Sequence, residues 1–578
     1  MRLTTLLLTA AVAAAVVADN PVKEAPRVLK PSEAGVGRLV PDVAFTDTAG
    51  KPGKLSDFKA GKLLVVAMTN TSCPVCKQYA PTLARIEKEY SPQGVAFLFV
   101  NPTATDKPDA SAFAGRYVHD TGHQLAAALG ARTTAEVFVL DAARTVVYRG
   151  AVDDQFGIGY ALDAPRNNYL ATALDDALAG RVPVTAATTA PGCELALTVA
   201  APKTPPTYHA RVERIVQHNC VECHRSGGVG PFELTTYDHV VAHKGMIRKV
   251  VERGTMPPWF AAPGEHSPWA NDRSLCDSDK ADLLAWLAGD LAKGDPADAP
   301  LPRTYPSGWL VGKPDAVFRI PQPIAVKAQG TMPYQHVSVD TDFDDDRWVQ
   351  ALEVRPTARD VVHHVLVFAV PRGSPRLVGE LHGFFAAYVP GNSTLVYPEG
   401  YAKKLPKGST LWFQIHYTPN GSATSDRTEL GLVFAKAPPR HEVRVVGIAN
   451  RAFTIPPGAD NYKIESRTPV PFDARAVAFL PHAHLRGKAA RYDVRFPDGT
   501  TKPLLEVPRY DFNWQLVYRP AEPVAVPRGS TITYTAWYDN SDKNPANPDP
   551  TKPVKWGRQT DDEMHIGYLE YAVPGPGR

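Results

Sequence analysis

The stretch Phe479-Leu480-Pro481-His482-Ala483-His484-Leu485-Arg486-Gly487 decides how the C-terminal half of this chain is interpreted. Side chains on a β-strand alternate between faces, so His482 and His484 are predicted to point the same way and to hold one metal ion. Downstream, Gln559-Thr560-Asp561-Asp562-Glu563-Met564 ends in one of six methionines, and Met564 is the predicted third ligand. Imidazole with a thioether favours copper, because soft sulfur prefers Cu(I).

A second set of histidines lies upstream. His363 and His364 stand in the apolar run 361–368, and His416 stands in the strand-like run 411–417, on the face opposite its aliphatic residues. Neighbouring residues of a regular strand cannot point the same way, so a β-bulge or a strand end is predicted at His363 and His364. The sequence therefore predicts two copper ions, one held by three histidines and one by two histidines and a methionine.

The order His-His, His, His-x-His and Asp-Glu-Met resembles the copper type II, ascorbate-dependent monooxygenases, the family of peptidylglycine alpha-hydroxylating and dopamine beta-monooxygenases. The resemblance covers residues 313–578 and implies two all-β, jelly-roll-like sandwich lobes, 313–440 and 441–578, that face a cleft. It implies an electron-relay copper on His363, His364 and His416. It also implies a second copper, which activates O2 and abstracts hydrogen from the substrate, on His482, His484 and Met564.

The same resemblance implies an enzyme, a copper-dependent monooxygenase that acts on a small organic substrate and O2 with ascorbate or another redox protein as electron donor. The peptide-hydroxylating members hold a peptide carboxylate with an arginine two residues before the His-x-His pair, and this position is Leu480 here, so a peptide C-terminus is not expected. Tyr568 matches a substrate-side tyrosine of those enzymes. The turn-rich stretch 540–550 precedes Met564 and is expected to border its site.

Length and composition limit the other possibilities. At about 100 to 200 residues per domain, 578 residues predict three to five domains. The chain has 63 basic and 60 acidic residues and a net charge of +3, so no polycationic face for nucleic acid is expected. Its 55 prolines fit loops and β-rich domains rather than long helices.

Residues 1–18 begin Met1-Arg2, continue as an apolar run and end at Ala18, which is the pattern of a secretory signal peptide. The apolar run is too short to span about 30 Å of hydrocarbon, and no later segment qualifies, so no membrane span is expected. The protein is therefore predicted to be exported, in a bacterium to the periplasm, where cysteines meet an oxidising environment.

The first folded domain is predicted at residues 36–195. A buried strand at 62–68 leads into Thr71-Ser72-Cys73-Pro74-Val75-Cys76-Lys77, where a helix N-terminus would lower the pKa of the first thiol. Cys73 is the predicted nucleophile and Cys76 its resolving partner. With further strands predicted at 95–100, 136–140 and 145–150, this α/β pattern resembles the thioredoxin-like redoxins, a group that includes the peroxiredoxin relatives.

The position of the cis-proline of thioredoxin-like proteins reads Thr133-Thr134-Ala135-Glu136 here. A cis bond without proline costs about 2.5 to 4 kcal/mol, so a trans Thr134–Ala135 bond is predicted and ordinary exchange with protein dithiols is not. A static disulfide between Cys73 and Cys76 is the alternative interpretation. Cys193 is either a distant resolving thiol or idle.

A proline-rich linker at 200–207 leads to a helical pattern and then to Cys220-Val221-Glu222-Cys223-His224, the attachment signature of c-type haem. Two thioether bonds from Cys220 and Cys223 would hold one covalent haem, with His224 on the iron. The stretch 254–259 resembles the distal loop of small c-type cytochromes, which makes Met256 the expected second axial ligand, ahead of Met246 and His243. A small all-α cytochrome c-like domain is therefore predicted at 207–298.

Two alternatives concern the remaining cysteine chemistry. A zinc or redox Cys-x-x-Cys at this position would need a second ligand pair at suitable spacing, which the sequence lacks. Cys276 belongs to no motif and is expected to be a free, buried thiol.

Together these patterns predict an exported redox enzyme, a copper-dependent monooxygenase that receives electrons through a c-type haem. The N-terminal domain would keep thiols reduced, remove peroxide or assist maturation. The competing hypothesis is an electron-transfer or thiol-disulfide and peroxide redox protein without oxygenase activity.

Overall fold

The structure is a computed structural model that describes residues 24–157, 159–197, 205–263, 269–305, 308–372, 383–389 and 392–577. Residues 1–27 and 38–204 belong to one compact unit, and residues 28–37 and 205–578 belong to another. The predicted signal peptide, 1–18, lies outside the described residues. In the part of the chain that is described, no helix combines the length and the apolar character needed to cross a bilayer.

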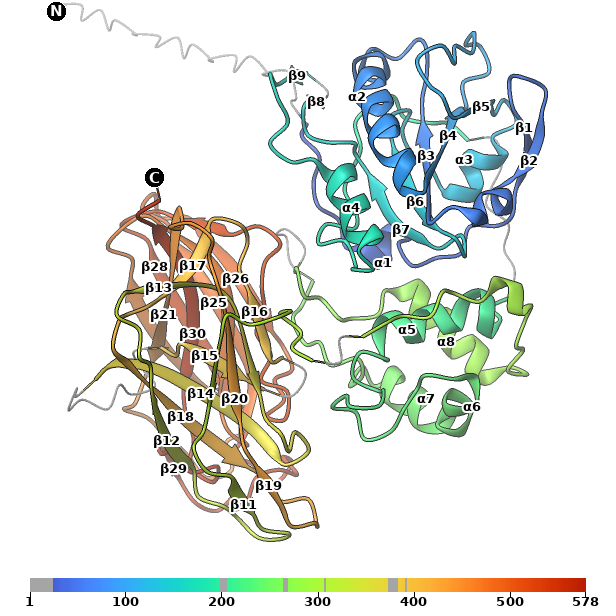
Figure 1. Cartoon of the computed structure of the whole chain (residues 1–578). Coiled ribbons are helices and arrows are strands. Elements are labelled where there is room, and N and C mark those ends of the chain that lie inside the picture. The colour runs from blue at the N-terminus through green and yellow to red at the C-terminus, as the bar shows by residue number, and fades with distance from the viewer. Residues whose placement is uncertain are drawn as a thin grey trace, which may run out of the picture. The chain divides into compact units, whose positions relative to one another are not determined.

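The first unit is built on a five-stranded sheet in the order β5-β4-β3-β6-β7 (Figure 1). β3 (Leu63–Met68) is buried along its whole length, as an apolar strand covered on both faces must be. It pairs in parallel with β4 (Val95–Asn101) and antiparallel with β6 (Val137–Asp141). Helix α2 (Pro74–Tyr90) begins directly after Cys73 and runs through Pro81. The strands predicted for this region are confirmed.

The remaining elements of the first unit are short. They are β1 (Ala44–Thr46), β2 (Pro52–Lys54), η1 (Leu55–Ala60), η2 (Ser91–Gln93), β5 (Arg116–His119), α3 (Gln124–Leu129), β7 (Val146–Gly150), β8 (Phe156–Gly157), β9 (Tyr160–Ala161) and α4 (Tyr169–Leu178). The hydrophobic core lies between the sheet and α2, and both Cys73 and Cys76 belong to it. The thiols are therefore placed by core packing as well as by the helix start.

The second unit begins with helices. They are α1 (Pro31–Ala34), the π-helical turn η3 (Tyr208–Val212), α5 (Glu213–Asn219), α6 (Tyr237–Ala242), α7 (Lys244–Glu252), α8 (Asp277–Ala288) and η4 (Pro296–Asp298). Val212, Ile215 and Val216 of the first helical turns pack with Leu283 and Trp286 in one core. Cys276 is free and buried, as expected.

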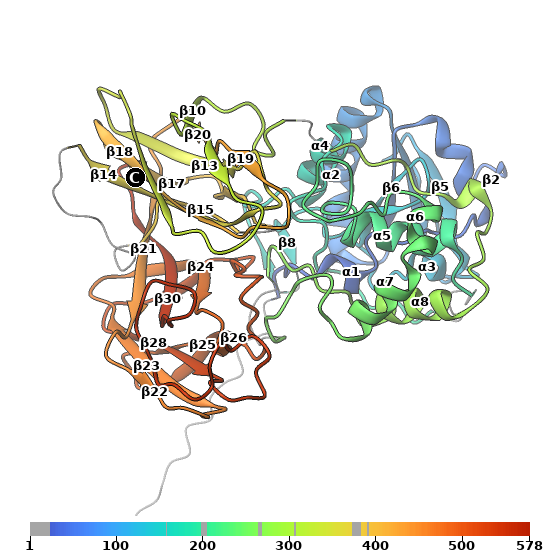
Figure 2. The same ribbon diagram turned by 90° about the horizontal axis from the view of Figure 1, so that it is seen from below.

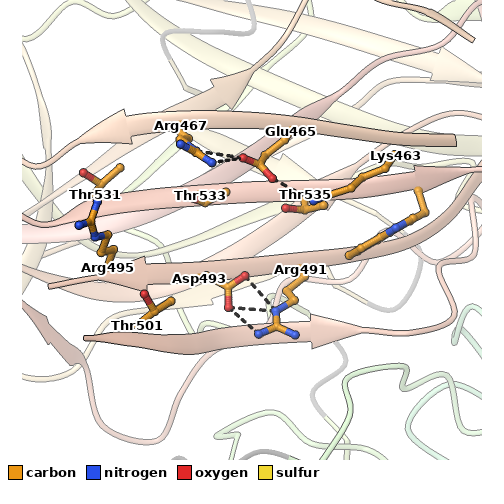
Figure 3. Close-up of a pocket in the computed structure, with 11 residues that line it drawn as sticks. Lys463, Glu465, Arg467, Arg491, Asp493, Arg495, Thr501, Thr531, Thr533 and Thr535 are labelled. Carbon is orange, nitrogen blue, oxygen red and sulfur yellow. Dashed lines mark hydrogen bonds and ion pairs between the residues drawn. The ribbon is translucent and has the colours of Figure 1, made fainter. Parts of the chain in front are cut away.

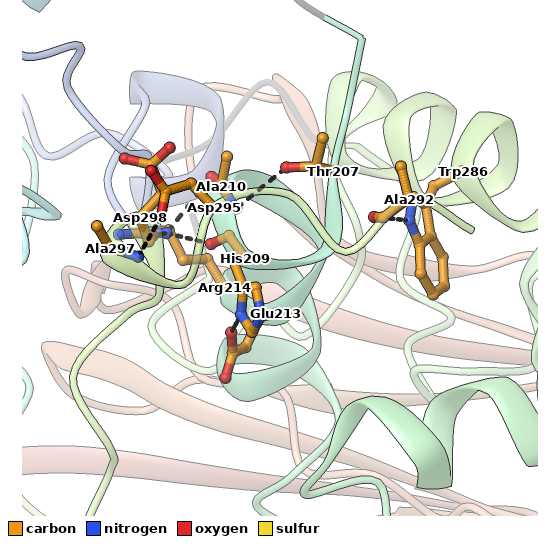
Figure 4. A network of polar contacts seen from close by, with 10 residues as sticks. All are labelled: Thr207, His209, Ala210, Glu213, Arg214, Trp286, Ala292, Asp295, Ala297 and Asp298. Carbon is orange, nitrogen blue, oxygen red and sulfur yellow. Dashed lines mark hydrogen bonds and ion pairs between the residues drawn. The ribbon is translucent and has the colours of Figure 1, made fainter. Parts of the chain in front are cut away.

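Buried hydrogen bonds join the start of this helical segment to its end (Figure 4). The guanidinium of Arg214 donates to the carbonyl oxygens of His209 (2.7 Å) and Asp298 (2.6 Å). The indole N–H of Trp286 donates to the carbonyl of Ala292 at 2.9 Å. These bonds join the first helical turn to the end of the segment, because a buried guanidinium must find acceptors.

The rest of the second unit is made of strands, which are short or of moderate length. They are β10 (Ala316–Arg319), β11 (Ile324–Val326), β12 (Gln335–Asp340), β13 (Arg347–Arg355), β14 (Val362–Pro371), β15 (Ala386–Tyr388), β16 (Thr394–Val396), β17 (Tyr401–Leu405), β18 (Ser409–Tyr417), β19 (Thr424–Asp426), β20 (Glu429–Phe434), β21 (His441–Ala449), β22 (Thr454–Ile455), β23 (Tyr462–Pro469), β24 (Ala474–His482), β25 (Gly487–Arg495), β26 (Thr501–Val507), β27 (Val524–Val526), β28 (Thr531–Tyr538), β29 (Val554–Lys555) and β30 (Ile566–Pro574).

These strands form two lobes that share one long sheet (Figure 2). The nine-stranded sheet follows the order β10-β20-β13-β17-β21-β30-β24-β27, with β16 beside β13. The sheet β12-β18-β14-β15 belongs to the first lobe and β23-β28-β25-β26 to the second, and each lobe has its own core. β17 pairs in parallel with β21, so the long sheet crosses the predicted boundary at residue 440.

The loop after α7 packs on the second lobe. Trp259 and Phe260 belong to the core of that lobe, and the Trp259 ring lies 5.0 Å from the ring of Tyr518. Backbone hydrogen bonds continue the contact, from Ala262 N to Glu506 O (2.8 Å) and from Ala270 N to Arg519 O (2.7 Å). The helical segment and the second lobe are thus joined through the described part of this loop.

Candidate copper centres and thiol site

The first histidine set lies on two paired strands, β14 and β18. The register of this pair shifts between Val362 and His364, so His363 sits at a bulge, as predicted. His364 lies directly opposite His416 on β18. On a regular strand only one of two neighbouring histidines could point toward a given metal ion. The bulge lets both His363 and His364 do so.

The three imidazoles lie at the spacing of a metal site. The ring centroids of His363, His364 and His416 are 5.1 to 5.4 Å apart, and one ligand atom from each lies within 4.8 Å of the others. The Nδ1 atoms of His363 and His364 are 3.2 Å apart. Two imidazole nitrogens that bind one ion at about 2.0 Å in tetrahedral geometry lie about 3.3 Å apart, so the arrangement fits a metal.

Burial keeps these histidines neutral. It lowers the pKa of His363 to about 3 and that of His416 to about 4, and it lowers the pKa of His364 as well. The Nδ1 atom of His416 is buried without a hydrogen-bond partner. Buried polar atoms are normally paired, so this lone pair fits a bound cation.

The second set is assembled where β24 ends. The ring centroids of His482 and His484 are 5.4 Å apart, so the pair comes together as predicted. The prediction that both lie on one strand was wrong, because β24 ends at His482 and the chain then turns, with Gly487 N donating to His484 O at 3.1 Å. The β24–β30 register pairs His482 with Ile566, and two residues farther on each side stand His484 and Met564.

Hydrogen bonds fix the rings of the second set. The Nδ1–H of His482 donates to Oε1 of Gln515 at 2.6 Å, and the Nδ1–H of His484 donates to the carbonyl of Asp562 at 3.2 Å. Nε2 of His484 is buried without a partner. In His484, Nε2 is therefore the nitrogen that can bind a metal, which is the usual way a protein orients ligating histidines.

A buried carboxylate joins the two loops of this site. Glu563 accepts backbone N–H bonds from His484, from Met564 (2.8 Å) and from Arg486 (3.0 Å). Burial raises the pKa of Glu563 to about 7 in spite of these donors. The sequence identified Glu563 only as the neighbour of Met564, although Glu563 binds the backbone of both predicted ligands, His484 and Met564.

His565 follows Met564 but cannot serve as a ligand. Its ring is fully buried, Nε2 lies 3.1 Å from the hydroxyl of Ser466, and Nδ1 lies 3.1 Å from the hydroxyl of Tyr538. Met564 is 4 % exposed and belongs to an apolar cluster with Tyr568 and Leu480. A thioether in such surroundings is shielded from water.

The two ligand sets face each other. The ring centroids of His364 and His482 are 6.5 Å apart. Phe512, which sequence reasoning did not identify, stacks on His363 at 4.5 Å and lies 6.3 Å from the ring of His484. One aromatic side chain thus contacts both sets.

The turn-rich loop 540–550 borders the second set, as expected. Its Asn544 side chain donates to the carbonyl of Leu485 at 3.1 Å, and its Asn540 side chain accepts from Nε of Arg486 at 2.9 Å. Both contacts fall on the turn that follows His484.

A separate hollow of about 540 Å³ lies on the sheet β23-β28-β25-β26 (Figure 3). Its charged lining includes two ion pairs within single strands, Glu465 with Arg467 (2.6 Å) and Asp493 with Arg491 (2.8 Å). No predicted ligand lines this hollow, so it is not part of the histidine sites.

The thiol site lies at the start of α2. Cys73 is the N-cap residue, and Sγ of Cys76 lies 2.9 Å from the carbonyl oxygen of Thr134. The pKa of Cys73 falls to about 4, chiefly because Cys76 hydrogen-bonds to its sulfur. The one cis peptide bond among the described residues is Met256–Pro257, so the predicted trans bond between Thr134 and Ala135 is confirmed.

The Cys-x-x-Cys-His motif follows helix α5. The thiols of Cys220 and Cys223 are free, and the Nδ1–H of His224 donates to the carbonyl of Phe232 at 3.0 Å. This bond leaves Nε2 as the nitrogen that can bind iron, which fits an axial ligand. Met256 is half-buried in the loop that packs on the second lobe, whereas the Met246 side chain is 52 % exposed on α7.

Two family models match the chain. Residues 35–159 match Redoxin, and residues 444–576 match the copper type II ascorbate-dependent monooxygenase, C-terminal domain.

Similar solved structures include three bacterial proteins. A hypothetical protein from Sinorhizobium meliloti 1021 is 26% identical, with a TM-score of 0.25, over 28% of this chain and 96% of its own. An uncharacterized conserved protein from Geobacillus kaustophilus is 26% identical, with a TM-score of 0.25, over 29% and 94%. Peroxidoxin BcpB from Mycobacterium tuberculosis is 20% identical, with a TM-score of 0.19, over 25% and 94%. The two family matches show that this chain combines a redoxin domain with the C-terminal domain of a copper type II ascorbate-dependent monooxygenase.

Proposed function

We propose that the chain is an exported, copper-dependent monooxygenase that places one oxygen atom of O2 into a small organic substrate, with electrons supplied through a covalent c-type haem. The observation that carries this proposal is the pair of facing, buried ligand sets, in which a nitrogen of His416 and a nitrogen of His484 are buried without a hydrogen-bond partner. The second set lies within residues 444–576, which match the monooxygenase model, and the first set precedes them in the sequence. Copper held by the two sets would supply one-electron transfer and activation of O2.

The residues of the first set act as a neutral three-nitrogen site. Because burial keeps His363, His364 and His416 uncharged, their lone pairs stay available at neutral pH. The second set differs in offering two nitrogens and the soft sulfur of Met564. The first set is proposed as the electron-relay site and the second as the site of oxygen activation.

The surroundings of Met564 support an uncharged substrate. Leu480, Tyr568, Phe384 and Val517 are buried with Met564 in one apolar cluster, which excludes water from this side of the site. Leu480 and Tyr568 are paired neighbours on β24 and β30. An apolar side chain at position 480 offers no partner for a carboxylate, so the proposed substrate is a small apolar or aromatic molecule.

The helical segment 207–298 is proposed as a cytochrome c-like domain that feeds the copper region. Cys220 and Cys223 would attach the haem, and His224 and Met256 would be its axial ligands. Haem held there would carry single electrons. The route is supported by packing, since the loop that contains Met256 continues onto residues 506–519, and Gln515 in that stretch holds His482. Ascorbate or another redox protein is the proposed outer donor.

The redoxin domain is proposed as a dithiol centre, with Cys73 as nucleophile and Cys76 as resolving thiol. Its support is the hydrogen bond from Cys76, which stabilises the thiolate of Cys73. In the same exported protein this centre would keep thiols reduced or remove peroxide.

The test is substrate-dependent oxygen uptake by the copper-loaded, haem-containing chain with ascorbate and a panel of small aromatic substrates. Met564→Ala should lower uptake by more than about 100-fold, because a metal ligand matters at least as much as the partners that orient ligands. The haem spectrum should be unchanged. Val396→Ala, at a side chain 53 % exposed in the first lobe, is the control and should keep full uptake. Hydroxylation retained by Met564→Ala would refute the assignment of Met564.

A further inference from the structure

Three cysteines meet in the redoxin unit, not two. The Sγ atoms of Cys193 and Cys73 are 3.7 Å apart, although 120 residues separate them in the sequence. Cys73 and Cys76 are only 2 % and 4 % exposed, whereas Cys193 is exposed. An external thiol can therefore reach Cys193 and cannot reach the two buried sulfurs directly.

Backbone pairing holds Cys193 at this place. Thr134 N donates to Cys193 O at 3.0 Å, and Cys193 N donates to the hydroxyl of Thr134 at 3.0 Å. Leu195 N donates to Arg132 O at 2.9 Å, and Thr133 forms an antiparallel bridge with Glu194. The chain's own segment 193–195 thus lies along the loop 132–134 as an extended peptide would, with its cysteine over Cys73.

Gly192 makes this approach possible. Its φ is +115°, a conformation that other residues rarely adopt. A Cβ at this position would lie 2.9 Å from both Ala135 N and Thr134 Oγ1. The residue before Cys193 therefore has to be glycine if the segment is to lie against the Thr134–Ala135 loop.

We infer that Cys193 is the third thiol of a relay, in which it exchanges into a disulfide with Cys73 and is the sulfur where a thiol reductant enters the unit. This inference goes beyond the proposed oxygenase function and does not depend on copper or haem.

The steps balance as ordinary thiol–disulfide exchange. The Cys193 thiolate attacks Sγ of Cys73 in the Cys73–Cys76 disulfide, a Cys73–Cys193 bond forms, and Cys76 leaves as a thiolate that takes up a proton. A thiol reductant then attacks Cys193, and Cys73 leaves. A second thiol of the reductant releases Cys193 and becomes oxidised, so two electrons reach the protein.

The electrostatics favour the second exchange, in which Cys73 leaves. Exchange is fastest when the leaving thiol has a low pKa, and the pKa of Cys73 is lowered to about 4. Cys76 leaves in the first exchange, and its raised pKa makes that exchange the slower of the two. The pKa of Cys193 is raised, chiefly through its contact with the Cys73 sulfur. That cause disappears when Cys73 is bonded to Cys76, so Cys193 becomes a better nucleophile in the oxidised form.

The first experiment traps the exchanged disulfide in the full chain. Cys76→Ser protein is oxidised with diamide and digested with trypsin without reduction. The expected product links peptide 63–77, which contains Cys73, to peptide 182–203, which contains Cys193. Alkylatable Cys193 with no such linked pair would overturn the inference.

The second experiment measures how fast dithiothreitol reduces the Cys73–Cys76 disulfide. Cys193→Ser should slow reduction about tenfold or more, because the entry thiol is lost. Gly192→Ala keeps all three thiols but displaces Cys193, and it should slow reduction as well. Glu194→Gln, an exposed neighbour, is the control and should match the parent chain. Unchanged or faster reduction in Cys193→Ser would show that the segment only covers Cys73, and the relay would be refuted.

Discussion

The thiol site and the histidine sets are both buried, yet the Cys73 thiol is ionised at neutral pH whereas the histidines are uncharged. Cys73 keeps a low pKa of about 4 because Cys76 and Thr134 stabilise its thiolate by hydrogen bonds. His363 has its pKa lowered to about 3 because burial penalises its charged form and because that form would be repelled by protonation of His416 or His482. In each case the form that remains has a free lone pair, so hydrogen-bond donors decide whether a buried group becomes a nucleophile or a neutral ligand.

The two sites also differ in how the chain assembles them. Cys73 and Cys76 are brought together by one turn of α2, which begins at Pro74. His364 and His416 meet only through the pairing of β14 with β18. The loops that carry His484 and Met564 are joined only at the ends of β24 and β30 and through Glu563. Loss of local helix structure should therefore affect the thiol site alone, whereas loss of strand register should affect the histidine sets.

The largest effect is expected for His416→Ala. Removing one of three ligands should abolish copper binding at the first set, lower bound copper from about two ions to about one, and reduce oxygen uptake more than about 100-fold. Metal analysis and an oxygen electrode measure both quantities. His336→Ala, at an exposed histidine on the neighbouring strand β12, is the matched control. Two coppers retained in His416→Ala would remove His416 from the ligand set.

Gln515→Leu should have the next largest effect. It removes the acceptor that orients His482, so copper affinity at the second set should fall about 10- to 100-fold. Competition titration with a copper chelator measures this change. The first set should keep its affinity, and Asn513→Ala, an exposed side chain two residues away, should leave both sets unchanged.

Cys76→Ala tests whether a hydrogen bond keeps the buried Cys73 thiol ionised. Without the hydrogen bond from Cys76, the pKa of Cys73 should rise by about one unit or more toward 9.0. Ultraviolet absorbance of the thiolate against pH measures it, with Cys73→Ser as the blank.

The pKa of Cys73 also predicts how stability depends on pH. Because the folded-state pKa is lowered from 9.0 to about 4, the thiolate stabilises the reduced fold fully above pH 9.0, and this contribution is lost as pH falls through about 4. The stability difference between the reduced parent and Cys73→Ser should shrink accordingly. A difference that grew on acidification would show that the thiolate is not stabilised by the fold.

The smallest effect is expected for Phe512→Leu. Stacked aromatic pairs contribute about 0.5 to 1.5 kcal/mol, so copper affinity at His363 should change roughly 2- to 10-fold. Chelator competition again provides the measurement. A change confined to the second set would mean that Phe512 supports His484 rather than His363.

Much of the thiol site and of the ligand sets could be predicted from the sequence. The Cys-x-x-Cys start of α2 follows from a local pattern, and the bulge at His363 follows from the impossibility of aiming two adjacent strand residues at one ion. The family matches confirm the two resemblances at 35–159 and 444–576.

The supporting residues could not be predicted in the same way. Gln515 and Phe512 lie in a loop without periodicity, and each reaches its histidine from a distant part of the sequence. Cys193 was noted only as a candidate, because its place beside Cys73 depends on the pairing of residues 193–195 with the Thr134 loop. The turn after His482 was missed because Glu563, which accepts its N–H groups, stands 79 residues from His484.

The most direct test of the proposed function is the amount of copper and of covalent haem per chain, in protein exported through a c-type maturation system and purified under mild conditions. The two ligand sets and the single Cys-x-x-Cys-His motif predict about two coppers and about one haem. Haem without copper, even after reconstitution with copper, would contradict the oxygenase and leave an electron-transfer or thiol-redox protein.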